Sequence, residues 1–224
     1  MVYIQSREQL NSPFVGTKIR TGDYLIQDRL PPEGEGVGAS LLFDRNHRCL
    51  AGFTHRRLRD YPVQGGPSTL RESTRDPELL NTSMGLLRHL DWVGVAMVEF
   101  KRDTRSNALT LMEINPRFWG SLALPVAAGV NFPLLLLGMA LGESLQPVFD
   151  YQVGVRARWL IPGDILHFLS NPGRFHLEPG FFRFFDKRTW YDDFDITDPS
   201  GNIAVVACTL FHALKPGMWK YLRR

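Results

Sequence analysis

The sequence predicts an α+β fold, in which helices pack on one face of antiparallel strands. Short apolar runs follow one another with brief polar connections, and only two long helical patterns, at 76–90 and 119–142, lie among them. This order favours sequential antiparallel strands over a regular alternation of strand and helix. The predicted strands are residues 2–5, 23–30, 38–44, 48–58, 93–101 and 108–114. With 224 residues, of which 44% are hydrophobic, the chain can bury a sizeable core.

The first third of the chain is read as a helix at 6–14 and a strand at 23–30, followed by a hairpin of strands 38–44 and 48–58. Residues 59–69 are expected to form a loop. Gly65 and Gly66 in that loop allow a close approach of the backbone, so that successive N–H groups can form an anion-binding nest. A helix beginning near Ser68 or Thr69 would add the positive end of its dipole.

The first long helix has a clear start. Asp76 is a good N-cap, Pro77 suits the first helical position, and Glu78 places an acid in the first turn. The second helical region, 119–142, contains a break at 129–133 that is expected to divide it in two.

The most informative feature is a pair of carboxylates in the last predicted hairpin. Glu99 and Glu113 can be cross-strand neighbours, and the period of two places Leu111, Glu113 and Asn115 on one face of their strand. Three oxygen ligands can then converge, which suits Mg²⁺ held by carboxylates and nucleotide phosphates. Arg117, two residues further on, would offer a fork of donors to a phosphoryl group or a bound acid.

A simpler interpretation is that Glu99 and Glu113 only face solvent. Both residues, however, stand between apolar neighbours, and two opposed carboxylates repel one another unless a cation joins them. The pattern therefore favours a metal site.

These residues resemble the ATP-grasp superfamily of ATP-dependent carboxylate ligases, and in particular its carbamoyl-phosphate-synthase-like branch. The resemblance rests on GVAMVEFK at 94–101 and LMEINPRFWGS at 111–121. The stretch 24–44 is similar to the hinge strand and the entry to the second subdomain, and 55–73 is similar to the large active-site loop. The predicted fold is thus an incomplete ATP-grasp fold, with the second subdomain and part of the first.

The resemblance implies a set of site residues. Glu99, Glu113 and Asn115 would bind one or two Mg²⁺ or Mn²⁺ ions, and Arg117 would act on the transferred phosphoryl group. The adenine pocket would be lined by Gln27, Asp28, Arg29 and Leu30, and Glu33 or Glu35 would accept the ribose hydroxyls. The residues expected near the phosphates and the carboxylate substrate are His55, Arg57, Gly65, Gly66, Ser68, Thr69 and Arg71.

Several of these residues also allow a simpler interpretation. Gln27 and Asp28 could end a strand before the two prolines, and Glu33 to Gly36 could form an acidic turn without a ligand. His55 to Arg57 could be an exposed basic face at the end of a strand.

The implied function is ATP- and Mg²⁺-dependent activation of a carboxylate as an acyl phosphate for attack by an amine, in a carboxylate-amine ligase. The chain opens on residues that resemble a part of the family downstream of its phosphate-binding lysines, so an N-terminal portion is expected to be missing. The alternative is a non-catalytic remnant that binds a nucleotide, a metal or a partner.

Composition excludes several other classes. The net charge of +3 is mild, and no aromatic and basic pattern of a nucleic-acid-binding module is present. Cys49 and Cys208 have no metal-ligand spacing and are expected to be buried small side chains. The longest apolar segment, 132–141, is shorter than the ~20 residues that span a bilayer. No signal peptide is recognised, so a cytoplasmic location is expected and a membrane role is not.

Two domains are predicted: residues 1–145 form the ATP-grasp domain, and 146–224 form an aromatic-rich C-terminal extension with a terminal helix at 203–214. The aromatic stretch 181–191 could pack the extension on the core or dock a partner chain. The expected partners are small carboxylate and amine substrates, and a separate N-terminal half or a second copy of the chain.

Overall fold

The computed structural model describes residues 4, 6–10, 30, 34–63 and 65–215. The chain divides into two compact units, Met1–Pro31 and Pro32–Arg224. In the first unit, α1 (Arg7–Leu10) is a short helix inside the predicted 6–14. The predicted strands at 2–5 and 23–30 lie almost entirely outside the described residues. Of the helices that the structure describes, none is long and apolar enough to cross a membrane.

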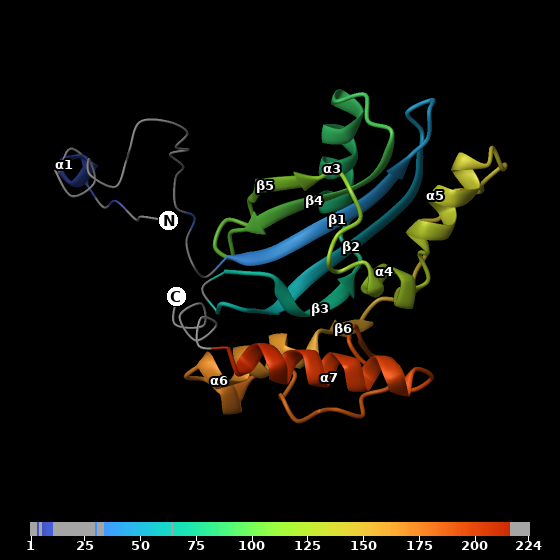
Figure 1. The fold of residues 1–224 in the computed structure, drawn as a ribbon. Helices are drawn as coiled ribbons and strands as arrows, with labels where there is room; N and C mark the ends of the chain where they lie inside the picture. The colour runs from blue at the N-terminus through green and yellow to red at the C-terminus, as the bar shows by residue number, and fades with distance from the viewer. Residues whose placement is uncertain (1–3, 5, 11–29, 31–33, 64, 216–224) are drawn as a thin grey trace. The chain divides into compact units, whose positions relative to one another are not determined.

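The second unit is built on one mixed sheet, which has seven strands among the described residues in the order β5-β4-β1-β2-β3-β6-β7 (Figure 1). All neighbouring strands are antiparallel except β6 and β7, which are parallel. The strands are β1 (Glu35–Phe43), β2 (Cys49–Asp60), β3 (Ser68–Thr74), β4 (Gly94–Arg102), β5 (Leu109–Asn115), β6 (Arg156–Arg158) and β7 (Thr189–Tyr191). The predicted α+β class is confirmed.

The segment from 59 to 74 differs from the prediction. β2 extends to Asp60 and β3 begins at Ser68, so the loop is shorter than the predicted 59–69. Ser68 and Thr69 begin a strand, so no helix dipole contributes at this point. β3 pairs with β2 on one side and with β6 on the other, which satisfies its backbone groups on both edges. The prediction of a loop followed from Gly65 and Gly66. The start of β3 was missed because its partner strand β6 lies far away in the sequence.

The helices of the second unit are α3 (Pro77–His89), α4 (Ala123–Ala128), α5 (Phe132–Ala140), α6 (Ile165–Ser170) and α7 (Pro199–Ala213). A π-helical turn, η1 (Leu160–Asp164), precedes α6, and a 3₁₀ turn, η2 (Arg174–His176), follows it. Asp76 caps α3 by accepting from Leu79 N at 3.0 Å, as predicted. The predicted division of 119–142 is confirmed: α4 ends at Ala128, its C-cap Gly129 has a φ of 110°, and Asn131 caps α5.

Apolar side chains and helices cover both faces of the sheet, so the predicted packing of helices on one face alone is wrong. Leu79 and Leu87 of α3 pack with Leu41, Val98 and other residues of the central strands on one face. On the other face, α4 and α5 pack on a cluster that includes Met97 and Phe53. The central strands are therefore packed from both sides.

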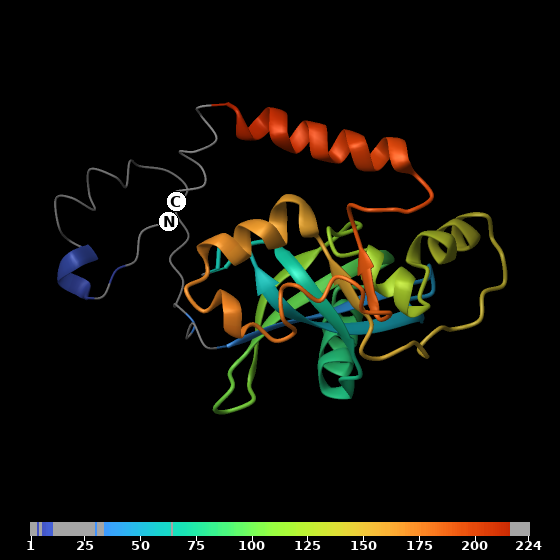
Figure 2. The same cartoon turned by 90° about the horizontal axis from the view of Figure 1, so that it is seen from below.

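The C-terminal part continues the sheet, because β6 pairs with β3. The predicted boundary at 145/146 thus lies within the unit Pro32–Arg224, and the two-domain division stays a prediction. The predicted terminal helix is observed as α7, which contacts η1 (Figure 2). Cys49 is half-buried, but Cys208 is exposed on α7, so the expected burial of Cys208 is wrong.

The aromatic stretch 181–191 is partly packed and partly exposed. The Phe181 ring stacks on Phe168 of α6 with ring centroids 4.3 Å apart. Phe182, Phe185 and Trp190 are exposed, Phe185 to 99%. Packing explains Phe181, whereas a docking role for the exposed rings stays a prediction.

Candidate functional site

The β4–β5 hairpin brings the two predicted carboxylates together. Glu99 pairs directly with Glu113, and Met97 pairs with Asn115. The cross-strand placement predicted from the sequence is confirmed. Side chains alternate along each strand, so Glu99, Glu113 and Asn115 share one face of the sheet.

A β-bulge corrects one detail of the predicted hairpin. Phe100 pairs with Leu111, although its neighbour Glu99 pairs with Glu113, so that Met112 is the extra residue. An extra residue reverses the alternation. Leu111 therefore lies on the face opposite Glu113, and its predicted place beside Glu113 and Asn115 is wrong.

Asn115 connects the two carboxylates. Its Nδ2 donates to Glu113 Oε1 at 2.9 Å and reaches Glu99 Oε1 at 3.4 Å. These hydrogen bonds partly offset the repulsion between two carboxylates on neighbouring strands. Glu113 is exposed, whereas the Glu99 side chain is only 12% exposed. The pair thus has one half-buried and one solvent-facing member.

Arg57 supplies the positive charge beside Glu99. Its Nη2 donates to Glu99 Oε2 in a close ion pair, and its Nη1 donates to the Gly66 carbonyl at 3.3 Å. The Asp60 carboxylate lies 4.0 Å from the same guanidinium. Arg57 therefore ties β2, the 61–67 loop and β4 together at the site.

Glycines in β1 make room for these side chains. A Cβ atom on Gly38 would lie 2.5 Å from His55 Cε1, and one on Gly36 would lie 2.9 Å from Arg57 Cδ. Gly38 pairs with Glu99 on one side and with His55 on the other. The β2 side chains thus lie over a bare part of β1 and reach toward Glu99.

Burial and charge set the protonation of the site. Desolvation raises the pKa of Glu99, and Glu113 and Asp60 raise it further, while Arg57 lowers it. Burial also raises the pKa of Asp60 against the opposing effect of Arg57. Burial, together with Arg57 and Arg71, lowers the pKa of His55 to about 3. His55 is therefore a neutral ring at neutral pH, and Arg57 carries the positive charge next to Glu99.

Arg117 is an exposed residue just after the end of β5. Its Nη1 donates to the Phe118 carbonyl at 3.0 Å. Its role toward a phosphoryl group stays a prediction.

The predicted loop residues divide into two groups. Arg71 is buried on β3 and pairs with Asp192 from the C-terminal part, and Arg71 pairs in register with Arg57. Gly66 presents its carbonyl to Arg57. Ser68 and Thr69, in contrast, bond elsewhere: Ser68 Oγ donates to the Arg59 carbonyl, and Thr69 Oγ1 donates to Asp164 at 3.1 Å. Thr69 is thus engaged away from the carboxylate pair.

The predicted adenine and ribose residues are mostly outside the described residues, namely Gln27, Asp28, Arg29 and Glu33. Leu30 is half-buried. Glu35 begins β1 and lies 3.6 Å from Arg56 in an ion pair. Their nucleotide roles stay predictions.

Sequence reasoning missed Gly36, Gly38, Asp60 and Asp192 as parts of this site. The glycines at 34, 36 and 38 do follow a period of two, which in a strand signals a bare face on which other groups lie. Asp192 carries no comparable signal, because it reaches Arg71 from 121 residues further along the chain.

Residues 54–161 match the model of a family described as ATP-grasp in the biosynthetic pathway with Ter operon. The matched segment contains Glu99, Glu113, Asn115 and Arg57. This segment, residues 54–161, belongs to the ATP-grasp superfamily. The predicted adenine residues precede residue 54 and therefore lie outside the matched segment.

Several solved structures align with part of the chain. Pyruvate carboxylase of Rhizobium etli aligns at 14% identity and a TM-score of 0.46, over 55% of this chain and 12% of its own. Biotin carboxylase of Campylobacter jejuni aligns at 13% identity and a TM-score of 0.44, over 55% of this chain and 28% of its own. The phosphoribosylaminoimidazole carboxylase ATPase subunit of Aquifex aeolicus aligns at 18% identity and a TM-score of 0.45, over 54% of this chain and 36% of its own. The chain thus spans about a third or less of the length of these proteins. No curated protein matches its sequence.

Proposed function

We propose that the chain is a module of an ATP- and Mg²⁺-dependent ligase that activates a carboxylate as an acyl phosphate for attack by an amine. The observation that carries the proposal is the direct pairing of Glu99 with Glu113, with Asn115 in hydrogen-bonding contact with both. The ATP-grasp family match supports ATP as the nucleotide.

The donor set fits Mg²⁺ or Mn²⁺. Two carboxylates and one amide oxygen are hard ligands, and Mg²⁺ is usually held by one or two carboxylates together with substrate phosphates. Among the described residues, no group of three or more His, Cys, Asp or Glu side chains could hold a metal by itself. Phosphate oxygens would therefore complete the coordination. Bound there, the ion would supply positive charge that neutralises the phosphates.

The chain's own residues would position the reactants. A substrate carboxylate oxygen attacks the γ-phosphorus, the bond to ADP breaks, and an acyl phosphate forms. The amine then displaces inorganic phosphate. Arg57 and Arg117 would stabilise the negative charge on the phosphoryl oxygens. The neutral His55 ring would add no charge to the site.

A second candidate is binding of a nucleotide or metal without turnover. It is favoured by the Arg57–Glu99 ion pair, because Arg57 already supplies Glu99 with a counter-charge and a metal ion must compete with it. A separate N-terminal half or a second copy as partner, and a cytoplasmic location, also stay predictions.

Trapping with hydroxylamine tests the proposed reaction. The full chain is incubated with ATP, Mg²⁺, hydroxylamine and a panel of carboxylic acids, and an acyl phosphate is detected as its hydroxamate. We expect hydroxamate from at least one acid, and a decrease on the order of 10- to 100-fold in Glu113→Gln, because that variant loses a metal ligand. Glu143→Gln, at an exposed position, is the matched control and should behave as wild type.

The outcomes separate the candidates. Hydroxamate formation that is equal in wild type and Glu113→Gln would contradict the role of the carboxylate pair. Binding of Mg-ATP without hydroxamate from any acid would favour the second candidate.

A further inference from the structure

A bulge in β2 turns Arg59 away from the carboxylate site. Arg57 pairs with Arg71 of β3, but Arg59 pairs with Leu70, the preceding residue. Because side chains alternate, Arg59 shares the face of Leu70, opposite Arg57 and Glu99. Leu70 pairs in turn with Arg158 of β6. Arg59 and Arg158 therefore flank Leu70 on the sheet face opposite the proposed metal site.

These two arginines share a single carboxylate. Arg59 Nη1 lies 2.7 Å from Asp164 Oδ2, and Arg158 Nε and Nη2 both lie 2.7 Å from the same oxygen. Arg59 is 3% exposed, Arg158 is 2% exposed, and Asp164 is fully buried. The trio thus holds two positive charges and one negative charge out of water. A buried charge without a counter-charge is unfavourable.

One buried donor in this trio lacks a partner. Arg59 Nη2 donates to the Pro179 carbonyl, but Arg59 Nε has no hydrogen-bond partner among the described residues. Arg158 is better satisfied, because it donates to the Phe181 carbonyl at 2.8 Å and lies over the Phe181 ring at 4.7 Å. An unsatisfied buried donor costs about 1–3 kcal/mol, so an acceptor at Arg59 would be stabilising.

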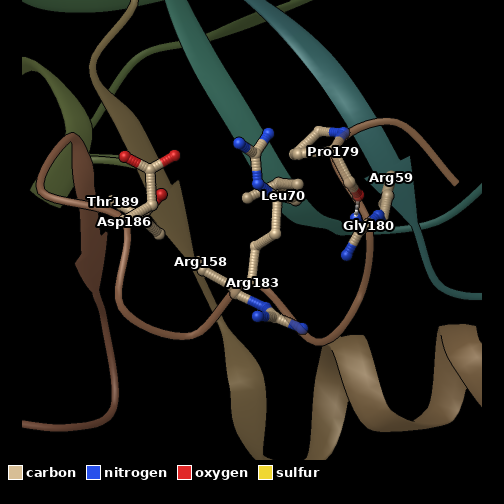
Figure 3. Close-up of a pocket in the computed structure, with 8 residues that line it drawn as sticks. All are labelled: Arg59, Leu70, Arg158, Pro179, Gly180, Arg183, Asp186 and Thr189. Atoms are coloured by element: carbon tan, nitrogen blue, oxygen red, sulfur yellow. Dashed lines mark hydrogen bonds between the residues drawn. The ribbon is translucent and has the colours of Figure 1, made fainter.

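A pocket opens at this point, and a third arginine lines it. Arg59, Arg158 and Arg183 line the pocket over the Leu70 side chain (Figure 3). Its enclosed part accommodates about one water-sized group, and the space that includes its open side is about 220 Å³. Asp186 also lines the pocket, but its carboxylate is paired with Arg156 at 3.0 Å.

We propose that this pocket binds one oxyanion group, a phosphate or a carboxylate. One oxygen of the anion enters the enclosed part and accepts from Arg59 Nε, and the exposed Arg183 guanidinium donates to the group from the open side. The anion supplies the negative charge that the Arg59–Asp164–Arg158 trio lacks. Guanidinium groups suit both oxyanions, because their planar fork matches two oxygens at once.

Calorimetric titration of the full chain with inorganic phosphate, and separately with acetate, tests this inference. Both titrations omit nucleotide and divalent metal and keep the ionic strength constant with sodium chloride. We expect one binding event per chain for at least one anion. Arg183→Ala should weaken it at least tenfold, and this exposed position should tolerate the change. Arg45→Ala, which removes an exposed arginine in the β1–β2 turn, should bind as wild type.

The two titrations distinguish a phosphate from a carboxylate ligand, and the Glu113→Gln variant distinguishes this pocket from the proposed metal site. Phosphate binding without acetate binding assigns a phosphate group, and the reverse assigns a carboxylate. Glu113→Gln should leave the binding unchanged, since Glu113 lies on the other face of the sheet. The proposal is overturned if neither anion binds, if Arg183→Ala binds as wild type, or if Glu113→Gln abolishes binding.

Discussion

At the residue scale, Glu99 is held between opposing effects. Burial and the neighbouring Glu113 favour the neutral carboxyl, whereas Arg57 favours the charged form. Because Arg57 donates directly to Glu99, the half-buried carboxylate has a counter-charge before any ligand arrives. A cation that binds the pair must compete with this arginine, and Arg57 would then be available to an incoming phosphate.

His55 gives a residue-scale prediction about pH. Its folded-state pKa of about 3 lies below the unfolded value, which is roughly 6.5. As the pH falls through that window, the unfolded chain gains a proton that the folded chain does not, so the unfolding free energy decreases. Relative to His55→Gln, wild type should lose roughly 2 kcal/mol between pH 6.5 and pH 4.5, measured by urea unfolding.

The comparison with His55→Gln removes other titrations from this result. The raised pKa values of Glu99, Asp60 and Asp193 act in the opposite direction, but both proteins carry these groups. Parallel curves of unfolding free energy against pH would show that His55 titrates normally in the folded protein.

At the element scale, alternating charges join four strands. Glu35, Arg56, Glu72 and Arg156 pair in sequence across β1, β2, β3 and β6, and Asp186 ends the series. The Glu72 side chain is 9% exposed and lies 2.7 Å from Arg56 and 2.9 Å from Arg156. Glu72 thus links the C-terminal strands to the central sheet.

Glu72→Gln should destabilise the protein by about 1–3 kcal/mol, because two guanidinium groups lose their shared carboxylate. Asp150→Asn removes the exposed Arg75–Asp150 pair and should have no measurable effect. The measurement is the urea midpoint at unchanged slope. Equal midpoints for wild type and Glu72→Gln would mean that this ladder does not stabilise the sheet.

The sequence predicted elements where a local pattern was strong and missed those that depend on distant partners. The β4–β5 hairpin and α3 follow from alternation and capping, both of which are local. β3 was missed because its pairing with β6 spans more than 80 residues. The bulges at Met112 and in β2 also escaped prediction, since one extra residue changes which face a side chain takes without changing composition.

At the scale of the whole molecule, the sheet separates two charged sites. The carboxylate pair lies on one face with α4 and α5, and the three-arginine pocket lies on the other, formed by β2, β3, β6 and residues 179–189. The C-terminal part therefore contributes to both faces, through Asp192 at Arg71 and through Asp164 at Arg59. An effect of one site on the other would pass through β2 and β3.

Binding of Mn²⁺ in the presence of ATP tests the central claim most directly. Equilibrium dialysis measures this binding, because the free Mn²⁺–ATP complex equalises across the membrane and only binding to the full chain retains an excess of Mn²⁺ on the protein side. Wild type and the exposed control Glu143→Gln should bind Mn²⁺ with ATP, whereas the double variant Glu99→Gln/Glu113→Gln should bind on the order of 10- to 100-fold more weakly. Equal Mn²⁺ binding by wild type and the double variant would contradict the assignment of this pair as the metal site.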